Sequence, residues 1–304
     1  MLHYSKFIQD FMKRYDYPKE AEELFSDILL KLDRDQGFAK KVDECVNTFR
    51  CGDGTVGSVL PELSRTAVLK GIKPYSLHFV YLLLLTEDLY KQYKLMGVDD
   101  EIYWDTMADL RYKLMECIEC KGYPGTFVAD WFDGFFRMKR VAYGRFQYEI
   151  GEYHGKEHYL KSGRILEDGD IFIGFHIPSS GVPLTDEIRF DSYRRAYKVF
   201  APLFPDGKVL FGCGSWLLYP AHRDFLPSHL NILKFMDDFE MISTNEDRDF
   251  HDAWRVFGKD AKLPYDRLPR DTSLKKAYAK RLYEDGRTGG GFGVILFDGE
   301  NIVR

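Results

Sequence analysis

The chain has 304 residues, 45% of them hydrophobic and 30% charged, a globular composition with room for about two domains of ~150 residues each. The formal net charge is -5 at pH 7 and no long basic run occurs, which argues against nucleic acid as a partner. The longest apolar run, residues 77–85, is far shorter than the ~20 residues of a membrane span, and residues 1–16 lack a signal-peptide pattern. We therefore expect a cytoplasmic protein without a membrane segment.

Helical periodicity runs through the first part of the chain, and strand-like alternation is absent there. Pro18 followed by acidic residues, and Asp99 with Asp100 before an apolar pattern, are typical helix starts. The predicted helices are residues 5–14, 18–32, 36–49, 57–71, 74–96, 98–120 and 127–137. Residues 1–140 are therefore predicted to form an all-helical N-terminal domain.

The pattern changes near Val141, where short apolar or alternating runs are separated by turn residues. The predicted strands are 145–150, 158–166, 171–177, 208–218, 239–243 and 291–297, and the predicted helices are 186–204, 228–237, 249–257 and 272–284. The glycine-rich residues 287–293, which precede a strand, are interpreted as a flexible turn with close backbone approach. Residues 141–304 thus predict a mixed α/β domain, which gives the whole chain an α+β fold.

The cysteines indicate a reducing compartment. They number five, an odd and sparse set: Cys45, Cys51, Cys117, Cys120 and Cys213. Cys117 and Cys120 form a C-x-x-C pattern inside a helical segment, but no second ligand pair follows at a suitable spacing. We therefore expect no metal site.

The most informative junction joins the apolar strand 171–177, the small-residue loop 178–185 and the helix 186–204. A helix N-terminus offers unpaired backbone N–H groups and the positive end of the helix dipole, and small residues let the backbone approach a phosphate. The alternative is an ordinary strand-to-helix turn capped by Thr185 or Asp186. No G-x-x-x-x-G-K-[ST] motif occurs, which weighs against a P-loop.

Three segments carry a resemblance to a known superfamily: GRFQYEIGEY (144–153), FIGFHIPSSGVPLTDE (172–187) and FGCGSWLLYP (211–220). With the order of elements, they make the C-terminal part similar to the GNAT superfamily of CoA-dependent N-acyltransferases. Over nearly its full length the chain resembles bacterial acyltransferase-domain proteins with a helical N-terminal domain. The resemblance implies a GNAT-like fold in which strands 171–177 and 208–218 splay apart.

The resemblance also implies a binding site for acetyl-CoA or another acyl-CoA, with its pyrophosphate at the loop before helix 186–204. The implied contacts are Ile177, Ser179, Ser180, Gly181, Leu184 and Thr185, with Asn231 after the splayed strand. Only Gly181 matches the family pattern [QR]-x-x-G-x-[GA], and Pro183 removes a backbone donor.

Acyl transfer from a thioester requires a neutral amine, and therefore a base, together with an acid near the leaving sulfur. Glu149 and His176 are the base candidates, and Tyr219 is the acid candidate that the resemblance implies. Their alternatives are a solvated strand carboxylate, a hydrogen-bonded core histidine and a packed tyrosine. His222 and His229 flank a loop and could line the acceptor side, but we expect surface positions for them.

These observations favour an N-acyltransferase that moves an acyl group, first of all acetyl, to a small-molecule or peptide amine. The broken phosphate-binding pattern motivates an alternative, a non-catalytic ligand-sensing or regulatory protein on a degenerate acyltransferase fold. Hydrolysis of a small substrate through Glu149 and the histidines is a third hypothesis. The acceptor, the acyl chain length, the oligomeric state and the role of the helical domain stay open.

Overall fold

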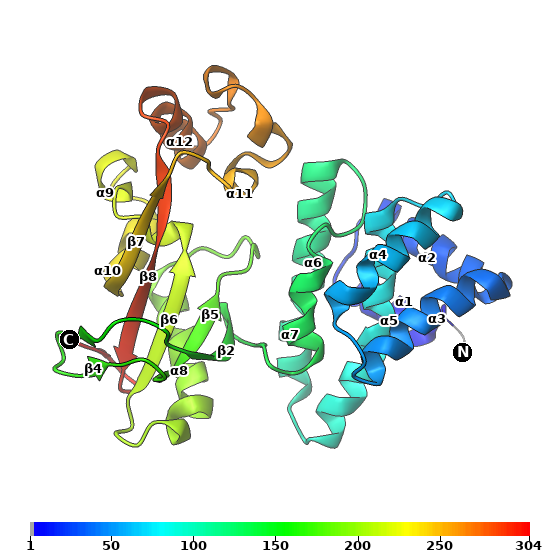
Figure 1. Ribbon diagram of the computed structural model, residues 1–304, viewed down its shortest axis with the longest axis horizontal. Helices are drawn as coiled ribbons and strands as arrows, with labels where there is room; N and C mark the ends of the chain where they lie inside the picture. The colour runs from blue at the N-terminus through cyan, green and yellow to red at the C-terminus, as the bar shows by residue number, and fades with distance from the viewer. Residues whose placement is uncertain (1–2) are drawn as a thin grey trace. The chain divides into compact units, whose positions relative to one another are not determined.

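The computed structural model describes residues 3–304, and the chain divides into two compact units between Val141 and Ala142 (Figure 1). The first unit is helical and the second is built on a mixed sheet, as the sequence predicts. Among the described residues, no helix combines the length and hydropathy needed to cross a membrane.

Six long helices make up the first unit, and local signals explain where they start. Ser5, Asp35 and Thr55 cap three of them, and each side chain accepts a hydrogen bond from a backbone N–H of the first turn. The helices are α1 (Lys6–Arg14), α2 (Lys19–Arg34), α3 (Gln36–Arg50), α4 (Val56–Leu69), α5 (Pro74–Leu95) and α6 (Asp100–Lys121). The apolar run 77–85 lies within α5 and is buried throughout, so it forms the centre of this core.

The helix predicted over residues 127–137 is wrong. The structure has a 3₁₀ turn, η1 (Ala129–Phe132), followed by a single helical turn, α7 (Asp133–Phe136). Side-chain contacts hold this segment: Trp131 Nε1 donates to Asp109 on α6 over 3.0 Å, and Asp133 accepts from the Val56 N–H. Tertiary contacts rather than helix propensity therefore set its shape.

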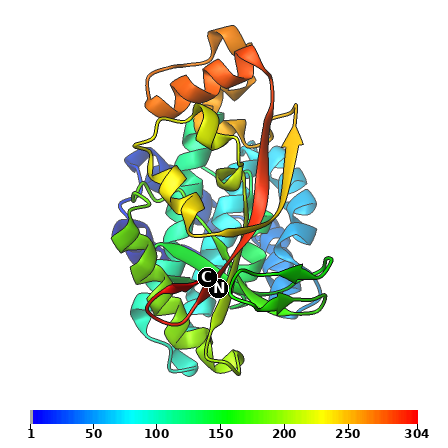
Figure 2. The same cartoon turned by 90° about the vertical axis from the view of Figure 1, so that its left-hand side faces the viewer.

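The second unit contains a seven-stranded sheet in the order β1-β2-β5-β6-β8-β7, with β9 paired to β8. Its strands are β1 (Val141–Tyr143), β2 (Phe146–Glu152), β5 (Ile171–His176), β6 (Val209–Ser215), β7 (Glu240–Asp247), β8 (Thr288–Phe297) and β9 (Ile302–Val303). β5 and β6 pair in parallel, whereas the pairs β2–β5, β6–β8, β7–β8 and β8–β9 are antiparallel. Figure 2 shows β7 and β8 running side by side.

One face of this sheet is covered by helix α8 (Asp186–Phe200). The Tyr193 ring of α8 stacks on Phe211 of β6 and on Phe146 of β2, with centroids 5.7 and 5.6 Å apart. The helices that follow are α9 (His222–Phe225), α10 (Asn231–Asp237), α11 (Ala253–Phe257) and α12 (Ser273–Glu284). A smaller core lies under α12, where Tyr278 stacks on Phe250 at 4.9 Å.

Several predicted boundaries need correction. The strand predicted to reach residue 218 ends at Ser215, because its hydroxyl accepts from the Leu217 N–H and starts the 3₁₀ turn η3 (Trp216–Leu218). The extended piece 158–166 is instead the small hairpin of β3 (His158–Tyr159) and β4 (Ile165–Leu166), apart from the main sheet. The helices predicted from 228 and 249 begin at Asn231 and Ala253.

The glycine-rich segment 287–293 is not a turn, because most of it lies within β8. A Cβ atom at Gly291 would lie 2.5 Å from the Met241 side chain, and one at Gly289 would meet the Tyr219 ring at 2.7 Å. The glycines thus let neighbouring groups pack directly on the strand backbone. The paired strand β7 extends to Asp247 rather than to the predicted residue 243, because it continues to pair with β8 as far as Thr288.

Candidate functional site

Strands β5 and β6 touch over only two rows. Their parallel register pairs Ile173 with Phe211 and Gly174 with Gly212. The register ends with the second pair, so the two strands part beyond Gly174 and Gly212. The backbone at the end of β5 is thereby left at an open edge inside the sheet, which is the geometry expected for strands 171–177 and 208–218.

Glu149 and His176, the two predicted base candidates, meet beside this edge. His176 ends β5, and Glu149 lies on β2 opposite Gly174. His176 Nε2 and Glu149 Oε1 are 2.6 Å apart, and the side chains are 32% and 27% exposed. The structure therefore joins them into one partly exposed carboxylate–imidazole pair that can share a proton.

A buried acceptor lies next to this pair. Gln147 is in register with His176, so its side chain points to the same sheet face. The residue is 2% exposed, and its Oε1 atom has no hydrogen-bond partner among the described residues. Buried polar atoms are nearly always paired, so this oxygen marks a place where a water or ligand N–H would be stabilised.

Two arginines hold the loop after β5 in place, and the sequence analysis missed both. Arg145 donates to the Pro178 and Val182 carbonyls over 2.9 and 3.0 Å. Arg189 of α8 donates to the Leu184 carbonyl over 2.7 Å. A rigid guanidinium is suited to bridging two fixed acceptors. The available sequence signal was an arginine in the turn before β2, which carries little information alone.

Arg189 is itself anchored by a buried ion pair. Its guanidinium donates to both carboxylate oxygens of Asp238, over 2.7 and 3.0 Å, and the side chains are 2% and 7% exposed. Tyr193 also donates to this carboxylate. Burial raises the pKa of Asp238, while the guanidinium beside it acts in the opposite direction. The pair joins α8 to the residue that directly follows α10.

Apart from Asn231, the predicted phosphate-binding residues lie in the loop from Ile177 to Thr185, which both arginines contact. Gly181 has φ +77°, and nothing lies within 4 Å of a Cβ built on it, so the loop is open there. Leu184 is buried, and Ser180 accepts from the Val182 N–H. Ile177 packs partly against the sheet core, and Ser179 lies in the same loop.

The helix N-terminus after this loop is not capped by a side chain. Thr185 occupies the N-cap position of α8 in an extended conformation, but its hydroxyl makes no capping hydrogen bond. Asp186 and Glu187 stand in the first turn, where their charges interact favourably with the helix dipole but would oppose a bound phosphate. Asn231, the remaining predicted contact, is the half-buried first residue of α10.

Tyr219, the predicted acid, is packed beside β8 and β7. Its hydroxyl donates to Glu246 over 2.7 Å, and Arg281 donates to it over 3.5 Å. Burial, and then the carboxylate of Glu246, raise the pKa of this phenol above its ordinary value. A raised pKa makes Tyr219 a weaker acid. Its role as the acid near the leaving sulfur stays a prediction.

His222 is not at the surface, and the expectation for it is wrong. It is 0% exposed, with Nε2 placed 2.5 Å from the Tyr278 hydroxyl and Nδ1 placed 3.3 Å from the Leu217 carbonyl. Burial lowers the pKa of this imidazole to about 4. The residue is therefore a neutral core histidine under α12.

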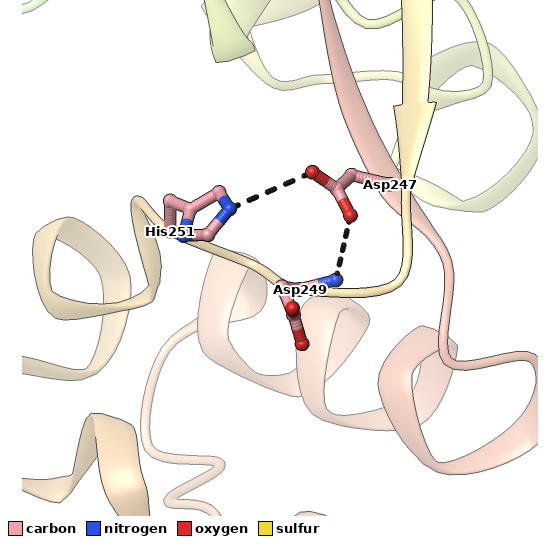
Figure 3. Close-up of side chains that lie close together, drawn as sticks. All are labelled: Asp247, Asp249 and His251. Carbon is pink, nitrogen blue, oxygen red and sulfur yellow. Dashed lines mark hydrogen bonds and ion pairs between the residues drawn. The ribbon is translucent and has the colours of Figure 1, made fainter.

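Figure 3 shows a group of three potential metal donors after β7 that the sequence analysis did not single out. Asp247, Asp249 and His251 place one donor atom each within 4.8 Å of one another. The Asp247 carboxylate also accepts from the Asp249 N–H and lies 3.6 Å from His251 Nε2. Local turn contacts thus account for the arrangement, which by itself indicates no ion.

Comparison with known proteins places both units in described families. The profile of the GNAT-like C-terminal domain matches residues 141–295, and that of the N-acyltransferase N-terminal domain matches residues 6–138. No curated protein matches the chain.

Solved structures of similar fold span nearly the whole chain. An acyltransferase mutant in complex with octanoyl-CoA is similar over 96% of this chain and 88% of that one, with a TM-score of 0.72 and 20% identity. An acyltransferase in complex with CoA and 10C-teicoplanin is similar over 98% and 90%, with a TM-score of 0.73 and 19% identity. The resemblance seen in the sequence is confirmed: the chain belongs to the family of the GNAT-like C-terminal domain, joined here to an N-acyltransferase N-terminal domain.

Proposed function

We propose that this protein transfers an acyl group from an acyl-CoA to an amine acceptor. The observation that carries the proposal is the Glu149–His176 pair beside the open edge of β5. A neutral amine attacks the thioester carbon, the amide bond forms and the C–S bond breaks. The amine proton passes to the Glu149–His176 pair, and the thiolate takes up a proton to leave as CoA thiol.

Backbone groups at the end of β5 are suited to the thioester carbonyl. Oriented backbone N–H groups stabilise the oxyanion that develops in acyl transfer, and they do so without reorganisation. The β5–β6 register ends at Gly174 and Gly212, so a ligand placed where the strands part can approach the backbone at the end of β5. The buried Gln147 oxygen would accept an N–H of the amine or of the pantetheine arm.

For the CoA pyrophosphate we propose the loop from Ile177 to Thr185, with Asn231 as a further contact. The positive φ of Gly181 and the empty space around it support a close backbone approach. Solved structures of similar fold contain octanoyl-CoA, decanoyl-CoA and CoA, and two of them also contain teicoplanin or 10C-teicoplanin. These neighbours support an acyl-CoA donor and a small-molecule acceptor; acetyl is the acyl group we propose first.

Calorimetric titration with acetyl-CoA tests the donor and its loop together. Gly181→Glu should abolish micromolar binding, because it puts a carboxylate where the pyrophosphate is proposed to lie. Gly163→Glu is the matched control, since Gly163 also has a positive φ, +86°, and open surroundings. Loss of binding in both variants, or in neither, would contradict the proposed loop. Absence of binding in the unmodified protein would overturn the donor class.

The loop chemistry also favours a second candidate, a ligand-sensing protein that binds acyl-CoA without turnover. Pro178 and Pro183 lack N–H donors, and Asp186 with Glu187 add negative charge beside the proposed phosphate position. Release of CoA thiol in the presence of a panel of amines separates the two functions. Binding without amine-dependent thiol release across the panel would favour the sensor.

A further inference from the structure

One aromatic ring covers the backbone of three adjacent strands in the second unit. Ring atoms of Phe172 lie 2.8, 3.4 and 2.5 Å from the Cβ positions that side chains would take at Gly151, Gly174 and Gly212. These glycines, here called the glycine floor, come from β2, β5 and β6. Real Cβ atoms essentially never come within 3.0 Å of another heavy atom, so the ring occupies the space that side chains at Gly151 and Gly212 would need.

The glycine floor lies on the sheet face opposite α8. Residues alternate between faces along a strand, so Phe172, Gly174 and His176 share one face while Ile173 and Phe175 point to the other. The face toward α8 is filled by packed rings, including Phe175 and Tyr193 with centroids 5.9 Å apart. On the opposite face the three glycines carry no side chains, and the space over them is filled by the single ring of Phe172.

The Phe172 ring limits how far a ligand could extend over these glycines. Gly174 and Gly212 form the last row in which β5 and β6 pair, directly before the strands part. Phe172 is two residues upstream of Gly174, about 7 Å along the strand. Its ring packs edge-to-face with Phe292 of β8, with centroids 5.5 Å apart. Glycine within a strand commonly marks the close approach of a ligand or another group. At Gly174 and Gly212 the group that approaches is the Phe172 ring.

We infer that Phe172 determines the acyl chain length that the protein accepts. This inference rests on the proposed function. An acyl chain leaving the thioester at the end of β5 toward Gly174 and Gly212 would meet the Phe172 ring, which covers these glycines, after a few carbons. Short acyl groups fit in front of the ring, whereas longer ones require its displacement. Each buried methylene contributes about fourfold in affinity, so removing the ring should favour longer chains steeply.

The test is the ratio of the dissociation constants of octanoyl-CoA and acetyl-CoA, measured by calorimetry for the full chain. In the unmodified protein we expect octanoyl-CoA to bind no more tightly than acetyl-CoA. Phe172→Ala should strengthen octanoyl-CoA binding relative to acetyl-CoA by at least tenfold, and Phe172→Leu should do so by less. Phe190→Ala, which shortens a half-buried ring on α8, is the matched control and should leave the ratio within twofold.

A second variant guards against misfolding and tests the geometry directly. Gly212→Ala should lower the melting temperature when Phe172 is present, because the new methyl would lie 2.5 Å from a ring carbon. In the Phe172→Ala background, Gly212→Ala should lower the melting temperature less. It should also reverse part of the increase in octanoyl-CoA affinity, because the new methyl group takes up some of the space that the ring left. An unchanged ratio in Phe172→Ala, with acyl-CoA still bound, overturns this inference alone. No binding of any acyl-CoA by the unmodified protein overturns the proposed function as well.

Discussion

Glu149 Oε1 and His176 Nε2 lie 2.6 Å apart although 27 positions separate the two residues in the chain. The antiparallel register of β2 and β5 brings them to the same face, two register positions apart. At this distance the carboxylate can orient the imidazole through a hydrogen bond. This arrangement makes the pair the first target for mutation.

Glu149→Gln and His176→Asn should each lower the rate of amine-dependent CoA release by about 10²- to 10⁴-fold, the usual contribution of a general base. The affinity for acyl-CoA should change by less than about threefold, because neither side chain is proposed to hold the pyrophosphate. Steady-state kinetics and calorimetry give the two quantities. Glu152→Gln, which changes a 58% exposed carboxylate of the same strand, is the control. Equal rates in Glu149→Gln and in Glu152→Gln would contradict the proposed role.

Breaking the buried pair between Arg189 and Asp238 should be costly. Asp238→Asn leaves the guanidinium without a compensating charge and should lower the free energy of unfolding by about 3–5 kcal/mol. The neighbouring Asp237 forms an exposed pair with Arg223, with side chains 61% and 50% exposed. Asp237→Asn should therefore cost less than about 1 kcal/mol. Urea unfolding of both variants measures the difference, and similar losses would show that the buried pair is not an anchor.

Removing Arg145 should loosen the loop with little effect on global stability. Arg145→Ala deletes both hydrogen bonds to the loop carbonyls, and Arg145→Lys cannot restore them together because an ammonium lacks the planar fork. Both variants should weaken acetyl-CoA binding about tenfold through loss of preorganisation. Arg195→Ala, at a half-exposed arginine paired with Asp191, is the control. Unchanged calorimetric affinity in Arg145→Ala would separate this arginine from the binding site.

The free energy of unfolding should decrease as the pH is lowered, over a range set by the pKa of His222. Its pKa drops from an ordinary 6.5 to about 4 on burial, so between these values the unfolded chain takes up a proton that the folded chain does not. The contribution of His222 is therefore present above pH 6.5 and lost progressively toward pH 4. Over the whole window the loss is about 3 kcal/mol, at 1.36 kcal/mol for each unit of pKa.

The measurement for His222 compares urea unfolding of the unmodified protein and His222→Gln at pH 7 and pH 4.5. The variant cannot titrate at this position. The difference in free energy of unfolding between the two proteins should therefore be smaller by about 2–3 kcal/mol at the lower pH. His154→Gln, which changes a 70% exposed side chain, should leave the pH dependence unaltered. A gap of the same size at both pH values would mean that His222 does not titrate as its burial requires.

Local signals in the sequence were sufficient for the six long helices of the first unit and for the central strands. The apolar run 77–85 is buried within α5, and the segment 171–177 is β5 apart from its last residue. Periodicity and capping residues act over a few positions, so they can be read without the rest of the chain. Local signals also explain the error at residues 287–293. A glycine-rich stretch by itself is typical of a turn, and only the packing of β7 and the Tyr219 ring on it shows that it belongs to β8.

What the sequence by itself determined is the class of each segment, the junction at 178–185 and a set of candidate residues that includes Glu149 and His176. Only the tertiary structure decided which of them meet. Strand register joined Glu149 to His176, side-chain packing placed His222 in a core, and Arg145 and Arg189 reached the loop from outside it. The physical reason is that such contacts depend on register and packing between segments far apart in the chain, which no local pattern encodes.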